Sequence, residues 1–148
     1  MDDLKAIKTF LRQAYDAQQK MDADKALLEI ARIRAEGVQG VQYDKISVDG
    51  GGGKPPALEG AALSIVQLEY DLATDVQQWT MALRNVRDII QVLPDACLRA
   101  ILERRYLRMM QFEQIAVDMG YSWRHVHRLH GLALAEAQKI LLTKRSLS

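Results

Sequence analysis

The chain has 148 residues, enough for one or two small domains, and 49% of them are hydrophobic, too many for a disordered protein. Residues with high helix propensity dominate and only three prolines occur, so the composition favours an all-α protein. The single cysteine excludes an intramolecular disulfide and favours a cytoplasmic protein. We expect no signal peptide and no membrane partner, because the sequence shows neither a basic and apolar leader nor about 18 consecutive apolar residues.

Charge is distributed unevenly along the chain, although the formal net charge is only +1. Residues 1–91 hold 11 Lys and Arg against 14 Asp and Glu, a net charge of −3. Residues 92–148 hold 9 against 5, a net charge of +4. An excess of positive charge at one end is typical of proteins that bind nucleic acid there, and chance clustering on a solvated face is the alternative.

Residues 4–36 have the pattern of one long helix with an apolar stripe at steps of three and four residues. The stripe consists of Leu4, Ile7, Leu11, Ala14, Met21 and Leu28, with Gln18 and Lys25 interrupting it. Gly37 and Gly40 predict the end of this helix. Residues 37–57 include Gly50–Gly53 and are expected to be a flexible connector. A phosphate-binding loop would need Ser or Thr after Lys54, where the sequence has proline.

Residues 58–93 predict a second long helix with a heptad pattern. Leu58, Ile65, Leu72, Trp79, Val86 and Leu93 recur every seven residues, and Ala62, Glu69, Val76, Leu83 and Ile90 interleave with them. Sustained over about five heptads, this pattern indicates a coiled coil. The two long helices pair either as an antiparallel hairpin or between two chains, and the sequence leaves both open. Glu69, opposite Gln18 and Lys25, is expected to set the register.

Three shorter helices are expected in residues 94–148. Pro94 ends the second long helix, and Asp95 is expected to cap a third helix that extends to about Met109. A fourth helix begins near Gln111, and Gly120 predicts a left-handed turn after it. Ser122 then caps a last helix. The predicted fold is therefore all-α, with a helical hairpin or coiled coil at residues 1–93 and a helix-turn-helix at residues 94–148, plain three-helix packing being the alternative.

The last helix carries two stripes between residues 122 and 133. Val126, Leu129 and Ala133 are expected to face inward, so the second stripe faces outward toward the major groove of double-stranded DNA. The expected base-reading residues are Ser122, Trp123, Arg124, His127 and Arg128. The expected phosphate contacts, which position a protein without reading sequence, are Arg104, Arg105, Gln114, His125 and Lys139.

No motif indicates catalysis or a cofactor. No nucleophile lies at an informative spacing from a general base, so we expect no enzyme. His125 and His127 point to different helix faces, and no Cys or carboxylate cluster completes a tetrahedral metal site with His130. We therefore expect neither a metal nor a cofactor.

Four stretches together resemble region 4 of the sigma-70 factors: Ile101–Tyr106, Phe112–Ala116, Gly120–Ser122 and Arg124–His130. The chain looks most similar to sigma-region-4-like phage and prophage proteins of the ArpU and RinA type, which share the layout of two long helices, a Gly-rich loop and this motif. Gln111 departs from the pattern, because Ser or Thr is more usual there. The specific motif covers residues 98–134.

The resemblance implies a transcriptional regulator of phage genes in the bacterial cytoplasm, with residues 122–133 in the major groove. RNA polymerase is a further partner that it suggests, although no residue here marks that surface. The coiled-coil half is expected to act either as the contact of a homodimer or as an arm that binds a partner. Two alternatives stay open: a small-terminase-like DNA-packaging oligomer, whose motif order is usually reversed, and a module that binds RNA polymerase or a sigma factor without DNA.

Overall fold

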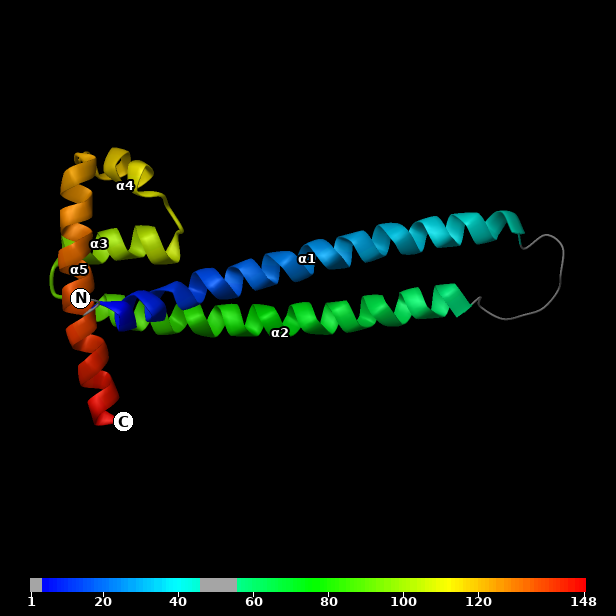
Figure 1. Cartoon of the computed structure of the whole chain (residues 1–148), viewed down its shortest axis with the longest axis horizontal. Helices are drawn as coiled ribbons and strands as arrows, with labels where there is room; N and C mark the ends of the chain where they lie inside the picture. Colours follow the sequence, from blue (N-terminus) through cyan, green and yellow to red (C-terminus); the bar gives the residue numbers. More distant parts are fainter. Residues whose placement is uncertain (1–3, 46–55) are drawn as a thin grey trace. The chain divides into compact units, whose positions relative to one another are not determined.

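The computed structural model describes residues 4–45 and 56–148, with side chains for residues 4–37 and 59–148. Every regular element in these residues is helical, which confirms the expected all-α class. The elements are α1 (Lys5–Lys45), α2 (Pro56–Val92), α3 (Ala96–Leu102), the π-helical turn η1 (Glu103–Leu107), α4 (Phe112–Met119) and α5 (Trp123–Leu147) (Figure 1). None of the helices described combines the length and the apolar character needed to cross a membrane.

The described residues form two compact units. The first, here called the terminal unit, comprises residues 4–17 and 78–148, and the second, the hairpin unit, comprises the described residues between 18 and 77. This division does not coincide with the expected boundary after residue 93. The reason is that the first turns of α1 and the last turns of α2 bury their apolar side chains together with those of α3 and α5.

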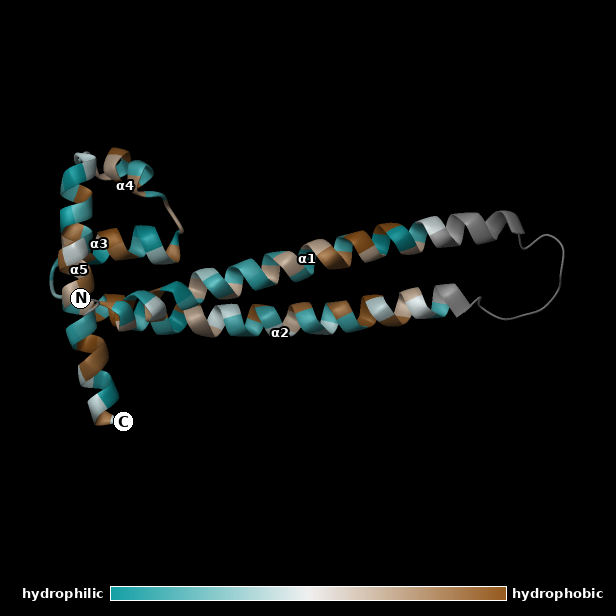
Figure 2. Cartoon of the chain, in the orientation of Figure 1, coloured by the Kyte–Doolittle hydropathy of each residue, from teal (hydrophilic) through white to brown (hydrophobic). Residues whose placement is uncertain are grey.

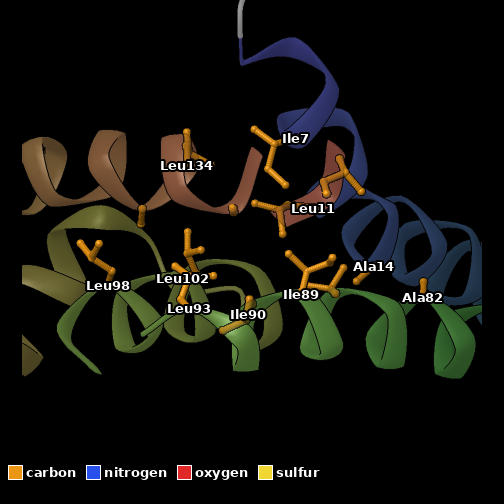
Figure 3. Close-up of a cluster of buried hydrophobic side chains, with 14 residues drawn as sticks. Ile7, Leu11, Ala14, Ala82, Ile89, Ile90, Leu93, Leu98, Leu102 and Leu134 are labelled. Carbon is orange, nitrogen blue, oxygen red and sulfur yellow. The ribbon is translucent and has the colours of Figure 1, made fainter. Parts of the chain in front are cut away.

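The core of the terminal unit combines side chains from four helices (Figure 3). Its buried residues include Ile7 and Leu11 of α1, Val86, Ile90 and Leu93 of α2, Leu98 and Leu102 of α3, and Leu134, Ala137 and Leu141 of α5. Burying an aliphatic side chain of this size is worth about 1.5–3 kcal/mol, so this core is the main source of stability in the unit. The Ile7 backbone N–H also donates to Gln138 Oε1 at 2.9 Å, which ties α1 to α5.

The hairpin unit pairs α1 and α2 side by side, in opposite directions (Figure 1). Arg32 lies 3.2 Å from Glu69, and Lys20 lies 3.5 Å from Asp75. Hydrophilic and hydrophobic residues are interspersed along the two helices (Figure 2). Of the residues described in this unit, only Leu28 and Asp75 are fully buried.

The acid that is buried between the two hairpin helices differs from the predicted one. Glu69 is half-exposed and Lys25 is exposed, whereas Asp75 is only 3% exposed. Leu68 and Asp75, rather than Glu69 and Val76, alternate with the heptad positions Ile65 and Leu72. Steps of three and four residues both keep side chains on one helix face, so the periodicity of α2 alone does not choose between the two series.

Some helices begin or end at the residues predicted from the sequence, and others do not. α1 continues past Gly37 to Lys45, because glycine costs only about 1 kcal/mol in a helix and does not forbid it. The Gly50–Gly53 segment of the expected connector lies outside the described residues. Pro56 is the first residue of α2, where its missing N–H is harmless. Asp95 caps α3 as predicted, but that helix gives way to the π-helical turn after Leu102 instead of extending to Met109.

Candidate nucleic-acid interface

A tight turn joins α4 to α5. Gly120 has φ 71°, in the left-handed region where glycine is favoured, and this confirms the expected conformation. The Tyr121 backbone N–H donates to the Ala116 carbonyl at 2.9 Å, which closes the turn. Ser122 Oγ then accepts the His125 backbone N–H at 3.1 Å, so Ser122 is the N-cap of α5 as predicted.

The N-cap residue of α4 is Gln111, where Ser or Thr would be more usual. The Gln111 backbone N–H donates to the Gln114 side-chain oxygen at 3.2 Å, so Gln114 supplies the acceptor that stabilises this end of α4. Ile115 and Ala116 of α4 pack on Val126 of α5 in a separate small cluster. Val126 is completely buried, as expected for the inward stripe.

Three of the expected base-reading side chains are exposed on the first two turns of α5. Trp123 is 54% exposed, and Arg124 and Arg128 are also exposed. Arg124 forms no ion pair with any residue that the structure describes. Arg128 Nη2 lies 3.3 Å from His125 Nδ1, and the His125 ring packs edge-on against Tyr121 at 4.8 Å.

His127 differs from the expected outward position. Its ring packs between Trp123, with centroids 3.9 Å apart, and Phe112, at 4.3 Å. Its Nε2 atom is buried without a hydrogen-bond partner in the described part of the chain. His127 therefore supports the indole of Trp123 rather than projecting into solvent, because Phe112 in the first turn of α4 covers its other face.

The expected phosphate contacts do not form one free surface. Arg104 donates to Asp118 Oδ2 at 2.6 Å and is only 24% exposed. The Arg105 guanidinium lies 4.3 Å from the centre of the Phe112 ring and donates to the Met110 carbonyl at 3.1 Å. Both arginines are engaged with protein groups, whereas Gln114 and Lys139 are exposed; Lys139 lies 3.3 Å from Glu136, one helical turn away.

The Arg104–Asp118 pair links the π-helical turn to α4. The hydrogen bond from Arg104 holds the pKa of Asp118 below its usual value. An acid with a lowered pKa in the folded state stabilises the fold at pH values above the pKa of the unfolded state, and this stabilisation is lost as the pH falls through the folded-state pKa. The pair therefore adds to the contact between the π-helical turn and α4 at neutral pH.

The terminal unit contains a cavity that was not expected from the sequence. It has a volume of about 490 Å³ and is lined by Lys8, Arg12, Tyr15, Arg105, Tyr106, Met109, Gln111, Phe112 and His130. The available signal was the spacing of Lys8, Arg12 and Tyr15, which stand four and three residues apart and so share a face of α1. Only the fold brings this face to Arg105 and His130.

The described residues hold no group of three or more His, Cys, Asp or Glu side chains that is arranged to bind a metal ion. The comparisons with known proteins give no match: no family model, no curated protein and no solved structure is significantly similar to this chain.

Proposed function

We propose that residues 94–148 form a helix-turn-helix that binds double-stranded DNA and regulates transcription of phage or prophage genes. The proposal depends on one observation above all. Trp123, Arg124 and Arg128 are exposed at the start of a helix whose orientation is fixed by a tight turn and a neighbouring helix. An α-helix fits the major groove of B-DNA, and exposed arginines there donate paired hydrogen bonds to guanine.

The N-terminal end of α5 adds an electrostatic argument. Helix N-termini carry partial positive charge from unpaired N–H groups, which favours nearby phosphate. Ser122 caps one of these groups, and no acidic residue occurs in the first turn of α5. Arg124 and Arg128 add their own positive charge, so this end of the helix is suited to an anionic partner.

The proposed roles differ from the sequence expectation at several residues. Trp123, Arg124 and Arg128 are proposed to read bases, and His127 is proposed to hold the Trp123 indole in place. Lys139, Gln114 and His125 remain candidates for phosphate contacts. Arg104 and Arg105 are not included, because Arg104 is paired with Asp118 and Arg105 lines a cavity with Lys8 and Arg12 instead of joining the exposed residues of α5.

The test is a selection of bound sequences from random duplexes, followed by affinity measurements on the selected and on random DNA. We expect Arg124→Ala and Arg128→Ala to lower the ratio of the two affinities by about tenfold, because each lost guanine contact is worth about 1–3 kcal/mol of discrimination. Lys139→Ala should weaken binding to both duplexes equally and reduce the salt dependence by about one unit.

Arg34→Ala is the matched control, since it removes an exposed arginine from the hairpin unit. Its DNA affinities should equal those of the unmodified protein. Equal losses on selected and random DNA for both α5 variants would contradict base reading by these residues. Binding that does not weaken as salt rises would contradict phosphate contacts altogether.

A protein-binding module is the second candidate, and Val117 is the observation that favours it. This side chain on α4 is 84% exposed, and Glu113 on the same helix is an exposed acid. An apolar and acidic helix face is better suited to RNA polymerase or a sigma factor than to DNA. Val117→Asp should abolish capture of RNA polymerase by this protein and leave DNA affinity within about twofold if both functions exist.

A further inference from the structure

The cavity between α1, the π-helical turn and α5 has the size of a ligand site. Its volume of about 490 Å³ is within the range of about 300–1,000 Å³ that small-molecule pockets occupy. All nine lining residues belong to the terminal unit. Neither Arg124 nor Arg128 lines it, so the cavity is separate from the proposed base-reading residues.

Three basic side chains line this cavity and no acidic side chain does. Lys8, Arg12 and Arg105 form no ion pair with the residues that the structure describes. Arg105 stacks on Phe112, and the Arg12 guanidinium lies 5.9 Å from the centre of the Tyr15 ring. Arg105 donates one N–H to the Met110 carbonyl, and its stacked guanidinium has further N–H groups that suit phosphate or carboxylate oxygens.

The walls of the cavity are aromatic and carry no additional charge at neutral pH. The Tyr106 hydroxyl lies 2.8 Å from His130 Nε2, and their rings stack at an angle of 22°. Burial, followed by the positive charges of Arg105, His127 and Lys8, lowers the pKa of His130 to about 4. The imidazole is therefore neutral at pH 7, and Tyr15 and Tyr106 supply flat surfaces on which a planar ring stacks.

The backbone beside the cavity departs from regular helix. Arg105 and Tyr106 lie on the π-helical turn Glu103–Leu107, which changes the direction of the side chains that follow α3. Met109, also a lining residue, has φ 56°, in the left-handed region that is unfavourable for a residue with a side chain. Both features cost free energy, and both are frequent where a backbone is shaped around a ligand.

We propose that this cavity binds a nucleotide, with its phosphate at Lys8, Arg12 and Arg105 and its base against Tyr15 and Tyr106. A phosphate neutralises the uncompensated charge, and a planar base uses the apolar walls. Neither a simple anion nor an uncharged ring satisfies both parts of the site. This proposal is independent of DNA binding by α5.

Calorimetric titration of the full chain with three probes tests the two parts separately. ADP carries both groups, adenosine carries the ring alone, and inorganic phosphate carries the anion alone. We expect ADP to bind at least about tenfold more tightly than either of the others. No heat of binding with ADP at about 1 mM, or equal affinities for ADP and phosphate, would overturn the proposal.

Variants then locate the site. Lys8→Gln with Arg12→Gln should lower ADP affinity by about tenfold or more and reduce its salt dependence, because both positive charges at the phosphate are lost. Both side chains are exposed and lie outside the core, so the double variant should keep its fold. Tyr15→Ala should weaken ADP and leave phosphate binding unchanged. Arg84→Gln, an exposed change on α2 that lies outside the cavity, is the matched control and should have no effect.

The same variants distinguish a nucleotide site from an extension of the DNA interface. If Lys8→Gln with Arg12→Gln weakens DNA binding while ADP does not bind the unmodified protein, the cavity contacts DNA phosphate and the nucleotide proposal is wrong. If ADP binds and DNA affinity is unchanged by the variants, the proposal holds even where the α5 residues fail their own test. Circular dichroism before each titration ensures that a lost affinity does not come from a lost fold.

Discussion

Single residues in the terminal unit show how a side chain acquires a role that its sequence neighbours do not reveal. His127 stands on the outward stripe of α5, yet Phe112 and Trp123 enclose its ring. Arg104 lies among several arginines of similar appearance, yet it alone is paired with Asp118. In both cases a residue from another helix removes the side chain from solvent, and sequence spacing within one helix contains no information about that partner.

Gly131 is a residue at which effects on stability and on the proposed DNA binding can be measured separately. It lies within α5, and a Cβ at this position would meet no atom within 4 Å. Gly131→Ala should therefore raise the free energy of unfolding by up to about 1 kcal/mol, because alanine has the higher helix propensity. Thermal unfolding followed by circular dichroism measures this change.

The DNA affinity of the same variant reports whether the duplex backbone approaches this part of α5. A variant that is more stable but binds DNA more weakly indicates close approach at Gly131. Gly60→Ala is the control, because Gly60 is also helical and equally open but lies in the hairpin unit. A loss of stability in Gly131→Ala would contradict the open space at this position.

At the scale of the element, the hairpin unit contains a buried acid where α1 and α2 meet. Asp75 is 3% exposed, its Oδ1 lies 3.5 Å from Lys20 Nζ, and its Oδ2 has no hydrogen-bond partner in the described residues. Hydrogen bonding to Asp75, with desolvation and its negative charge, raises the pKa of Asp24. A buried polar residue of this kind favours one register over others at a cost in stability.

We expect Asp24→Asn to stabilise the hairpin unit at pH 7, because it imitates the protonated acid. An acid with a raised folded-state pKa stabilises the fold fully below its unfolded-state pKa, and this contribution is lost as the pH rises through the folded-state pKa. The advantage of the variant should therefore disappear when the pH is lowered below the ordinary value of 3.8. Denaturant unfolding at several pH values measures the difference.

Asp22→Asn is the matched control, since Asp22 is an exposed acid on the same stretch of α1. It should change stability little at any pH. A destabilised Asp24→Asn at pH 7 would show that the attraction of Lys20 makes the ionised carboxylate of Asp24 favourable, and would contradict the raised pKa.

At the scale of the whole molecule, apolar residues are exposed on both helices of the hairpin unit. On α2, Leu63 is 71% exposed, Val66 62% and Tyr70 70%, at steps that share one helix face. On α1, Leu27, Ile30 and Ile33 are each close to half exposed or more. Clusters of exposed apolar side chains mark surfaces at which proteins associate.

We therefore expect the protein to form a dimer of twice its 16.7 kDa mass through these exposed apolar residues, which would give the proposed DNA-binding function two reading helices. Leu63→Lys with Tyr70→Lys should shift the mass measured by sedimentation to that of the monomer and weaken binding to a two-site duplex. Gln77→Lys, an exposed polar position on α2, is the control. A monomer before any substitution would contradict the expectation, and a ring of many subunits would favour the packaging alternative.

The sequence by itself determined the features that depend on neighbouring residues in the chain. The all-α class, the Asp95 and Ser122 caps, the left-handed Gly120 and the inward positions of Ile7, Leu11 and Val126 follow from local propensity and helical periodicity. These are short-range effects, so they can be predicted from the amino-acid sequence alone.

Only the tertiary structure decided which side chains from distant segments meet. Asp75, and not Glu69, is the acid buried in the hairpin, and Arg104 pairs with Asp118. Lys8 and Arg12 of α1 line one cavity with Arg105 and His130. The physical reason is that packing selects among registers that are equivalent in helical period. Contacts between residues about 100 positions apart are set by that selection, and no local pattern encodes it.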